Sequence, residues 1–161
     1  MVILYHASNK RIEKIENPEN KQIGLLKDFG YGFYCTKIQI QAIKWVERKY
    51  KFNGFVNEYF YDEERAKKEV KVKVFKPDDE WLDFIIKNRT SVLECEFDIV
   101  EGPMADDQIY NHIDDLYDGI ITRKEFWKLA EFSYPTNQIC FLTEKSITYL
   151  KFKGVKKYGK V

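Results

Sequence analysis

Short segments with strand periodicity alternate along this chain with segments of helical periodicity, and this alternation most restricts its fold. Residues 70–75, Val-Lys-Val-Lys-Val-Phe, alternate apolar and polar side chains, which predicts a strand with one face in water. Half-wet strands are typical of antiparallel sheets, whereas parallel sheets are buried on both sides. The predicted fold class is therefore α+β. The other strands that we expect span residues 2–6, 93–99 and 138–142.

The helices are indicated by start signals and by apolar residues on one face. Two pairs have the spacing of a capping box, in which side chains satisfy the first free backbone N–H groups: Thr36 with Gln39, and Thr122 with Glu125. The first box is expected to open a helix with Ile40, Ile43 and Val46 on one face. The other expected helices span residues 78–88 (with Trp81 and Ile85 on one side), 106–116, 122–132 and a short segment from Thr143.

The 161 residues contain no linker-like cluster and no repeat, so we expect a single domain over residues 1–161. Residues 7–30 are polar and predict a long loop with one helical turn; loops of this length often carry function. With 27 basic and 26 acidic residues, no overall field marks a nucleic-acid or membrane-surface protein. No apolar run approaches the roughly 20 residues that cross a bilayer.

Cysteine and histidine usage bears on the compartment and on metals. Cys35, Cys95 and Cys140 are an odd, widely spaced set, which favours free thiols in a reducing cytosol. His6 and His112, the only histidines, lie far from any paired cysteines, so we expect no metal site. The first residues enter a strand without a basic region or cleavage site, which predicts a cytoplasmic protein.

Charge is unevenly distributed along the chain. Residues 94–118 hold nine acids and no Lys or Arg, while residues 145–160 hold six lysines and no acid. Two solvated faces are one interpretation. The other is that the acidic stretch flanks a site for a cationic acceptor, and that the lysines hold phosphate or nucleic acid.

Three segments together suggest a site. They are the polar triplet His6-Ala7-Ser8 after the first strand, the run from Asp28 to Tyr34 before a helix, and Asn137-Gln138 leading into a buried strand. Each has a structural alternative: a satisfied histidine, a glycine turn with positive φ, and a capped turn. The glycine spacing matches neither a dinucleotide fingerprint nor a P-loop.

In their order these segments resemble the ADP-ribosyltransferases, specifically the branch of diphtheria toxin and the poly(ADP-ribose) polymerases, and within it a small uncharacterised bacterial group, DUF3990. In that family the first strand ends in His-Gly-Ser or His-Gly-Thr, which here reads His6-Ala7-Ser8. The family's Phe-Gly-x-Gly-Ile-Tyr-Phe is here Phe29 to Cys35. The catalytic Glu that opens the family's buried strand is replaced by Gln138. The resemblance spans nearly the whole chain.

The resemblance implies an ADP-ribosyltransferase-like split β-sandwich, in which two small antiparallel sheets pack at a steep angle with flanking helices and hold NAD between them. In such a cleft, His6 would hydrogen-bond the adenosine ribose. The main chain of Ala7 would pair with the nicotinamide carboxamide, with Ser8 at the pocket edge. Tyr34 would stack on the nicotinamide ring, with Tyr31 a candidate for the opposite face.

Gly32 and Gln138 are the remaining two motif positions. Gly32 would let the chain pass close to the ligand. Gln138 can accept a hydrogen bond from a ribose hydroxyl but brings no negative charge, and a charge-assisted hydrogen bond is roughly twice as strong as a neutral one. A carboxylate would better stabilise the oxocarbenium-like transition state of nicotinamide loss. Chain-extending members of the resembled family rely on that Glu, so the resemblance implies single transfer rather than chain extension.

Other charged residues are candidates for the same site, and each has a structural alternative. Glu144 is the nearest acid to Gln138, yet it fits the first turn of a helix. Asp106 and Asp107 would serve as ribose acceptor or base, or would simply begin a helix. Arg89 would contact the pyrophosphate, or cap the carbonyls at a helix end.

The leading hypothesis is a mono-ADP-ribosyltransferase that cleaves NAD and passes ADP-ribose to a macromolecule, a protein more than a nucleic acid. By analogy, this activity would suit a bacterial toxin with a neutralising antitoxin partner, or a delivered effector. A catalytically weak NAD- or ADP-ribose-binding module is the alternative that Gln138 motivates. An RNA-directed activity, based on the lysine-rich end, is the third.

Overall fold

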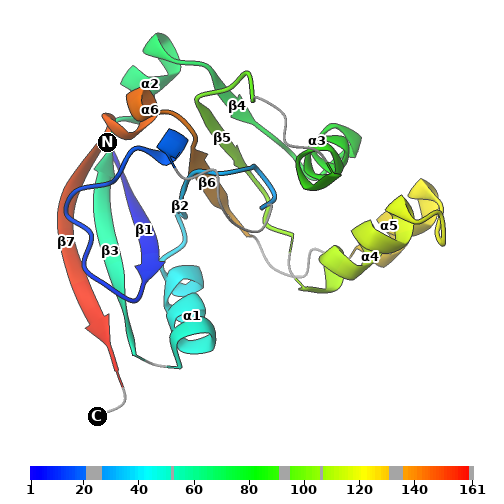
Figure 1. Cartoon of the computed structure of the whole chain (residues 1–161), viewed down its shortest axis with the longest axis horizontal. Coiled ribbons are helices and arrows are strands. Elements are labelled where there is room, and N and C mark those ends of the chain that lie inside the picture. Colours follow the sequence, from blue (N-terminus) through cyan, green and yellow to red (C-terminus); the bar gives the residue numbers. More distant parts are fainter. Residues whose placement is uncertain (21–26, 52, 91–94, 106, 131–135, 160–161) are drawn as a thin grey trace.

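The structure is a computed structural model of the chain that describes residues 1–20, 27–51, 53–90, 95–105, 107–130 and 136–159. These residues form an α+β fold with two small sheets (Figure 1). The strands are β1 (Val2–Ser8), β2 (Phe33–Cys35), β3 (Gly54–Tyr61), β4 (Val72–Val74), β5 (Ile99–Gly102), β6 (Gln138–Phe141) and β7 (Leu150–Tyr158). The helices are α1 (Gln39–Tyr50), α2 (Glu63–Glu69), α3 (Asp79–Thr90), α4 (Asp107–Tyr117), α5 (Arg123–Leu129) and α6 (Glu144–Ile147).

The first sheet has the strand order β1-β3-β7, and both of its pairs are antiparallel. In the β1–β3 register, His6 lies opposite Asn57. The β3–β7 register shifts between Glu58 and Tyr59, where the strand is irregular. This sheet forms one side of the molecule and carries both ends of the chain (Figure 1).

The second sheet has the order β2-β6-β5-β4 and is mixed rather than purely antiparallel. β6 pairs antiparallel with both β2 and β5, but β4 pairs parallel with β5. The parallel pair follows from the chain path, because α3 makes the crossover that a parallel connection requires. The expectation of antiparallel strands is therefore wrong for β4.

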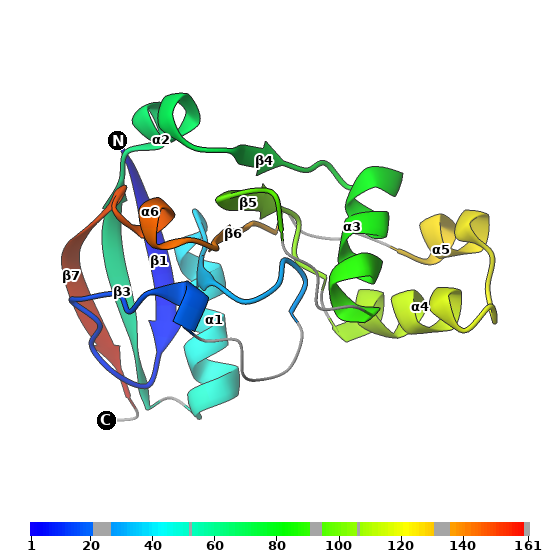
Figure 2. The same cartoon turned by 45° about the horizontal axis from the view of Figure 1, so that its top comes forward.

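The two sheets meet where β1 passes the end of β2. Tyr5 and Thr36 form an isolated antiparallel bridge, and each backbone N–H donates to the other residue's carbonyl at 2.9 Å. α1 begins three residues after Thr36 and lies along β1 and β3 (Figure 2). The bridge therefore fixes β1, β2 and the start of α1 relative to one another.

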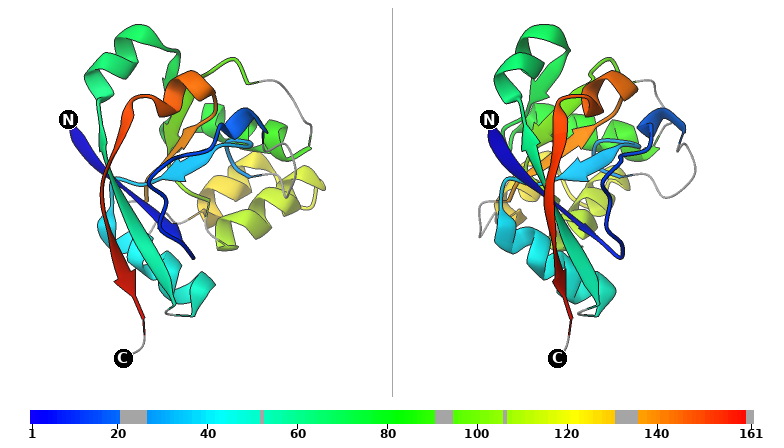
Figure 3. Two further views of the ribbon diagram at one scale, coloured as in Figure 1. Left: turned by 60° about the vertical axis from the view of Figure 1, so that its left-hand side comes forward. Right: turned by 90° about the vertical axis from the view of Figure 1, so that its left-hand side faces the viewer.

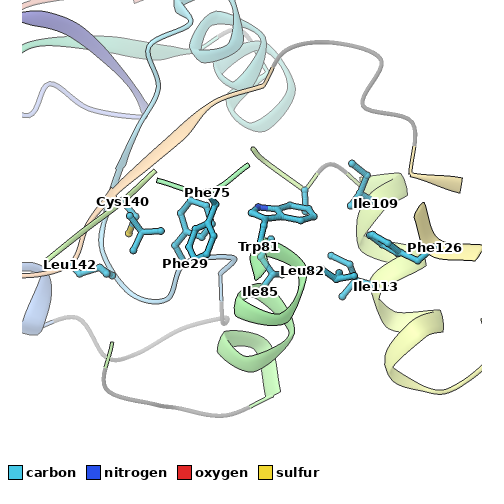
Figure 4. Packing of buried hydrophobic residues seen from close by; sticks show 12 residues of the cluster. Phe29, Phe75, Trp81, Leu82, Ile85, Ile109, Ile113, Phe126, Cys140 and Leu142 are labelled. Atoms are coloured by element: carbon cyan, nitrogen blue, oxygen red, sulfur yellow. The ribbon is translucent and has the colours of Figure 1, made fainter. Parts of the chain in front are cut away.

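The buried side chains form two main clusters. One fills the space between the sheets and includes Leu4, Tyr59, Ile139 and Phe141. The other lies behind the second sheet, where α3, α4 and α5 pack at the end of the molecule farthest from β7 (Figures 1 and 3). Figure 4 shows this second cluster and labels Phe29, Phe75, Trp81, Leu82, Ile85, Ile109, Ile113, Phe126, Cys140 and Leu142, to which Val100 and Ala105 also belong.

One of the two predicted capping boxes is confirmed and the other is wrong. Thr122 and Glu125 form a complete box at the start of α5. At α1, the N-cap is Ile38 and no side chain caps the helix. Thr36 instead accepts a hydrogen bond from the Ile38 N–H at 3.0 Å. The Thr36 side chain therefore closes a local turn two residues on, and Gln39 receives no cap from it.

The predicted helices and strands are largely found, with shifted boundaries. Trp81 and Ile85 are buried in α3, and Val46 is buried in α1, whereas Ile40 is 56% exposed. In the described part of residues 7–30, Ala7 and Ser8 belong to β1 rather than to a loop, and Pro18–Asn20 form the expected helical turn as a 3-10 turn. Of the strand expected over residues 93–99, only Ile99 belongs to β5. Residues 93–94, and 131–132 at the end of the expected fourth helix, lie outside the described part.

Candidate functional site

β1 brings His6 and Ala7 to a cleft beside the junction of the two sheets. The His6 Nδ1 lies 2.5 Å from the Tyr34 carbonyl oxygen, which can only accept, so Nδ1 carries a proton and donates. The ring stacks on Phe33 with its centroid 4.3 Å away. These two contacts hold the imidazole in one orientation, and Nε2 is the acceptor nitrogen of the neutral ring.

The Tyr34 side chain closes the loop that precedes its own strand. Its hydroxyl donates to the Gly30 carbonyl at 2.7 Å and accepts from the Phe29 N–H at 3.1 Å. Burial raises the pKa of Tyr34 well above its ordinary value, so the phenol stays protonated. The Lys27 Nζ lies 4.7 Å from the ring centroid. Tyr34 therefore offers the cleft an aromatic face, while its hydroxyl is committed to the loop.

The two glycines of this loop have different structural roles. Gly30 has a φ of +86°, a conformation that glycine adopts without strain. Gly32 allows close packing: a Cβ there would lie 2.3 Å from the Cys140 Sγ and 2.7 Å from the Phe141 carbonyl oxygen. Gly32 is not among the residues that line the cleft, and its missing side chain allows close packing against β6.

Gln138, the first residue of β6, lies in the same cleft and is 7% exposed. Its Nε2 donates to the Asp28 Oδ2 at 2.8 Å and to the Pro103 carbonyl at 3.2 Å. Both partners are acceptors, so the orientation of the amide is fixed. Asp28 is buried and also accepts from the Ala105 N–H at 3.2 Å.

The strand that begins at Gln138 is anchored by the residue before it. Asn137 and Gln41 exchange two hydrogen bonds between side chain and backbone, at 2.8 and 3.1 Å. The Asn137 side chain also accepts from the Lys37 N–H and donates to Glu101. Asn137 therefore joins β6 to α1 and to the residues after β2, which places Gln138 opposite the helix.

The cleft has a volume of about 450 Å³ and is lined by segments from both sheets, from α1 and from the start of α4. His6, Ala7, Tyr34 and Gln138, which the sequence places in three distant segments, all line it. Its volume lies within the range of small-molecule sites. Its other aromatic and charged lining residues are Tyr5, Lys27, Asp28, Trp45, Arg48, Lys49, Tyr50 and Tyr110.

Several sequence candidates do not line this cleft. The Ser8 hydroxyl accepts from the Lys10 N–H at 3.2 Å, and Tyr31 lies in the loop before β2. Glu144 opens α6, where its backbone N–H donates to Glu19. Glu144 therefore lies in the first turn of a helix, which is the structural interpretation of this residue.

Arg89 packs behind the cleft rather than lining it. Its guanidinium lies 3.6 Å from the Tyr110 ring centroid and forms an ion pair with Asp114 at 3.5 Å. Burial raises the pKa of Tyr110, and so do the charge of Asp28 and a hydrogen bond with its side chain. Asp106 and the side chain of Asp107 lie outside the described part.

Sequence reasoning missed the contribution of α1 to the cleft. Gln41, Trp45 and Lys49 are spaced by four and therefore share one helix face, with Arg48 beside them. All four line the cleft. The guanidinium of Arg48 lies 4.9 Å from the Trp45 ring centroid. An aromatic and basic stripe at helical spacing was the signal that could have identified this wall.

These features describe an α+β protein with a cleft where its two sheets meet. The model of a protein family described as a protein of unknown function, DUF3990, matches residues 2–152, and the chain belongs to this family. Comparison with curated proteins and with solved structures finds no match. In the described part of the chain, no helix is long and apolar enough to span a membrane. Nor do three His, Cys, Asp or Glu residues in that part gather as metal ligands.

Proposed function

We propose that this protein is a mono-ADP-ribosyltransferase that cleaves NAD and transfers ADP-ribose to a macromolecular acceptor. One observation carries the proposal: His6, Tyr34 and Gln138 come from three distant segments and line one cleft. These are the positions at which the chain resembles the ADP-ribosyltransferases. The volume of the cleft and its aromatic and basic walls suit a dinucleotide.

The chemistry needs a site that holds nicotinamide and stabilises a cation. Nicotinamide leaves the ribose through an oxocarbenium-like transition state, as in glycoside cleavage. The face of Tyr34 would stack on the departing ring. The Gln138 amide oxygen remains as an acceptor for a ribose hydroxyl, because both contacts of Nε2 are donated bonds. Arg48 and Lys49 would pair with the pyrophosphate.

His6 would orient the dinucleotide rather than transfer a proton. Its Nδ1 donates to the Tyr34 carbonyl, and Nε2, the acceptor nitrogen of that tautomer, would accept from a ribose hydroxyl. The same hydrogen bond links the imidazole to the strand that carries the stacking ring. Substrate orientation and ring stacking are therefore coupled through one short contact.

The absence of a carboxylate at residue 138 favours a single transfer over chain extension. A protein acceptor fits the near-neutral net charge of the chain better than a nucleic acid does. The toxin role with a neutralising partner, or the effector role, belongs to this proposal and follows from the resemblance alone. The cytoplasmic location also belongs to it and rests on the odd, widely spaced set of cysteines.

The experiment is transfer of label from NAD. The protein is incubated with NAD labelled at the adenylate phosphate and a bacterial lysate, which is then treated with protease or with nuclease. We expect label on a macromolecule that protease removes, and free nicotinamide in equal amount. If neither transferred label nor free nicotinamide is found, the proposal is overturned. Heat-denatured protein is the control.

A second candidate function is a binding module that holds NAD or ADP-ribose without cleaving it. It is favoured by the neutral amide of Gln138, whose N–H groups are committed to Asp28 and Pro103. Calorimetry that shows bound NAD, recovered intact after long incubation, would select this function. Nicotinamide in the supernatant would reject it.

An RNA-directed activity receives less support. The lysine-rich end forms β7, where Lys153 and Lys156 form ion pairs with Glu58 at 2.5 and 3.5 Å. Part of the positive charge that would attract phosphates is therefore neutralised within the protein. Loss of RNA binding after trimming residues 151–161 would restore this candidate.

A further inference from the structure

Asp28 is the one acid that lines the cleft in the described part of the chain. It lies two residues before Gly30, in the loop that Tyr34 closes, and its side chain is directed at the first residue of β6. Asp28 is 4% exposed. A carboxylate so buried needs partners for both of its oxygens.

The two oxygens of Asp28 are not equivalent. Oδ2 accepts from the Gln138 Nε2 at 2.8 Å and from the Ala105 N–H at 3.2 Å. Oδ1 is buried and has no partner that meets the distance and angle of a hydrogen bond, although the Tyr110 phenol lies close enough to Asp28 for the carboxylate to raise the pKa of Tyr110. In the described part of the chain, no Lys or Arg forms an ion pair with Asp28. An acceptor of this kind, buried and unpaired beside a cleft, is a candidate to accept a hydrogen bond from a ligand in that cleft.

We propose that Asp28 is a catalytic residue that supplies the negative charge which Gln138 lacks. This proposal rests on the proposed function. Oδ1 accepts a hydrogen bond from a hydroxyl of the nicotinamide ribose and stabilises the positive charge that develops on that ring. Gln138 is a positioning residue, because its amide holds Oδ2 and thereby sets the direction of Oδ1.

The step balances without a further reagent. The bond between the ribose anomeric carbon and the pyridinium nitrogen breaks, and its electron pair returns to the nitrogen, so that nicotinamide leaves neutral. The anomeric carbon gains a bond from a lone pair of the acceptor, which releases its proton to water. Asp28 neither takes nor gives a proton in this step and acts through its charge.

The proposal also explains why a glutamine is present at residue 138. Two carboxylates at hydrogen-bond distance cannot both remain ionised, so Glu at this position would force Asp28 or its neighbour to hold a proton. A glutamine keeps one anion in the cleft and fixes it with a donated hydrogen bond. The negative charge that the family has at residue 138 is therefore carried here by Asp28, whose Oδ2 lies 2.8 Å from the Gln138 Nε2.

The test compares wild type with Asp28→Asn, a neutral variant of the same size that still accepts from Gln138. We measure nicotinamide release in single turnover and the Kd for NAD by calorimetry. The expected result is a rate roughly 100- to 1,000-fold lower, the usual effect of losing one such contact, with a Kd within roughly threefold. Asp118→Asn, in the exposed turn after α4, is the matched control and should leave both values unchanged.

A double variant covers the case in which Asp28→Asn fails to fold. Asp28→Asn with Gln138→Glu exchanges the amide and the carboxylate across the same hydrogen bond. It should release nicotinamide within roughly 100-fold of the wild-type rate, because one anion is again present. A double variant that folds, binds NAD and is slower than wild type by more than roughly 100-fold would overturn the proposal.

The outcomes separate this proposal from the proposed function. If wild type releases nicotinamide and Asp28→Asn does so within roughly threefold of its rate, Asp28 is not catalytic, while the transferase proposal stands. If Asp28→Asn only weakens NAD binding, the role in the transition state is equally overturned. If wild type releases no nicotinamide, both proposals fail.

Discussion

At the scale of single residues, the candidate site depends on side chains that hold backbone in place as much as on those that face the cleft. The Tyr34 hydroxyl bridges the Gly30 carbonyl and the Phe29 N–H. The carbonyl of the same tyrosine accepts from His6. One residue therefore fixes the loop that carries Asp28 and the ring that would orient NAD.

The Tyr34→Phe variant tests this structural role. Removing the hydroxyl leaves the Phe29 N–H and the Gly30 carbonyl without their partner, which should lower the free energy of unfolding by about 1–3 kcal/mol. Urea denaturation measures the change. Tyr117→Phe, at a tyrosine that is 61% exposed, should change stability by less than about 0.5 kcal/mol. Equal effects of the two variants would contradict the role assigned to the hydroxyl.

The sequence predicts His6, Tyr34 and Gln138 through a resemblance, but it does not single out Asp28. Asp28 lies in the segment that carries the resemblance, yet its partner Gln138 is 110 residues further along the chain. Burial and a missing partner are properties of the folded chain, and no local pattern around an Asp predicts them. The position of Asp28 in the cleft therefore follows only from the three-dimensional contacts.

At the scale of elements, the pairing of β2 with β6 positions the Tyr34 side chain that lines the cleft. Tyr34 pairs with Cys140, and the loop before β2 lies against β6 at Gly32. There is no space for a side chain at Gly32, because Cys140 and the Phe141 backbone occupy it. The position of the stacking ring therefore depends on a glycine that does not line the cleft.

Gly32→Ala should separate β2 from β6. Its Cβ would lie 2.3 Å from the Cys140 Sγ, so the expected loss of stability is about 3 kcal/mol, at the upper end for overpacking. Gly154→Ala in β7 is the matched control, since nothing lies within 4 Å of its Cβ, and it should change stability by less than about 1 kcal/mol. Thermal unfolding of both variants measures this difference. A Gly32→Ala protein as stable as Gly154→Ala would show that the strands do not pack as described.

The contact between β3 and β7 makes stability depend on pH. A hydrogen bond from Lys153, together with the charges of Lys153 and Lys156, holds the pKa of Glu58 below its ordinary value. A lowered pKa means that this stabilisation is present above the unfolded value of about 4.3 and is lost as the pH falls through the folded value.

Glu58→Gln should therefore be less stable than wild type at neutral pH, by about 1 kcal/mol or less because both lysines reach solvent. The difference should shrink as the pH falls below about 4.3 and disappear once the pH is below the lowered folded pKa of Glu58. Urea denaturation of both proteins across this range is the measurement. A difference that grows as the pH falls would mean that the ion pairs do not stabilise the sheet.

The elements that the sequence misses have a common physical reason. β3 is a long strand with few polar positions, and β7 alternates lysines with apolar residues, so its segment was interpreted as a charged end rather than a strand. Both belong to one sheet whose order, β1-β3-β7, joins residues from opposite ends of the chain. Strands that pair across such a long stretch of sequence are stabilised by tertiary contacts, so the local sequence predicts them only weakly.

At the scale of the whole molecule, two small sheets that meet at the Tyr5–Thr36 bridge leave one cleft against α1. The α+β class and most helices could be predicted from periodicity and start signals. The mixed second sheet, the wall of α1 and the unpaired oxygen of Asp28 could not, because each depends on how the sheets pack. The central claim is that NAD lies in this cleft with its nicotinamide ribose beside Asp28 and Gln138.

The measurement that tests this claim most directly is a crystal structure with a carbocyclic NAD analogue, whose bond to nicotinamide cannot break by the oxocarbenium route. We predict the nicotinamide ring against Tyr34, a ribose hydroxyl within hydrogen-bond distance of the Asp28 Oδ1, and the pyrophosphate near Arg48 and Lys49. An analogue bound elsewhere on the protein, or an empty cleft at saturating analogue, would contradict the account.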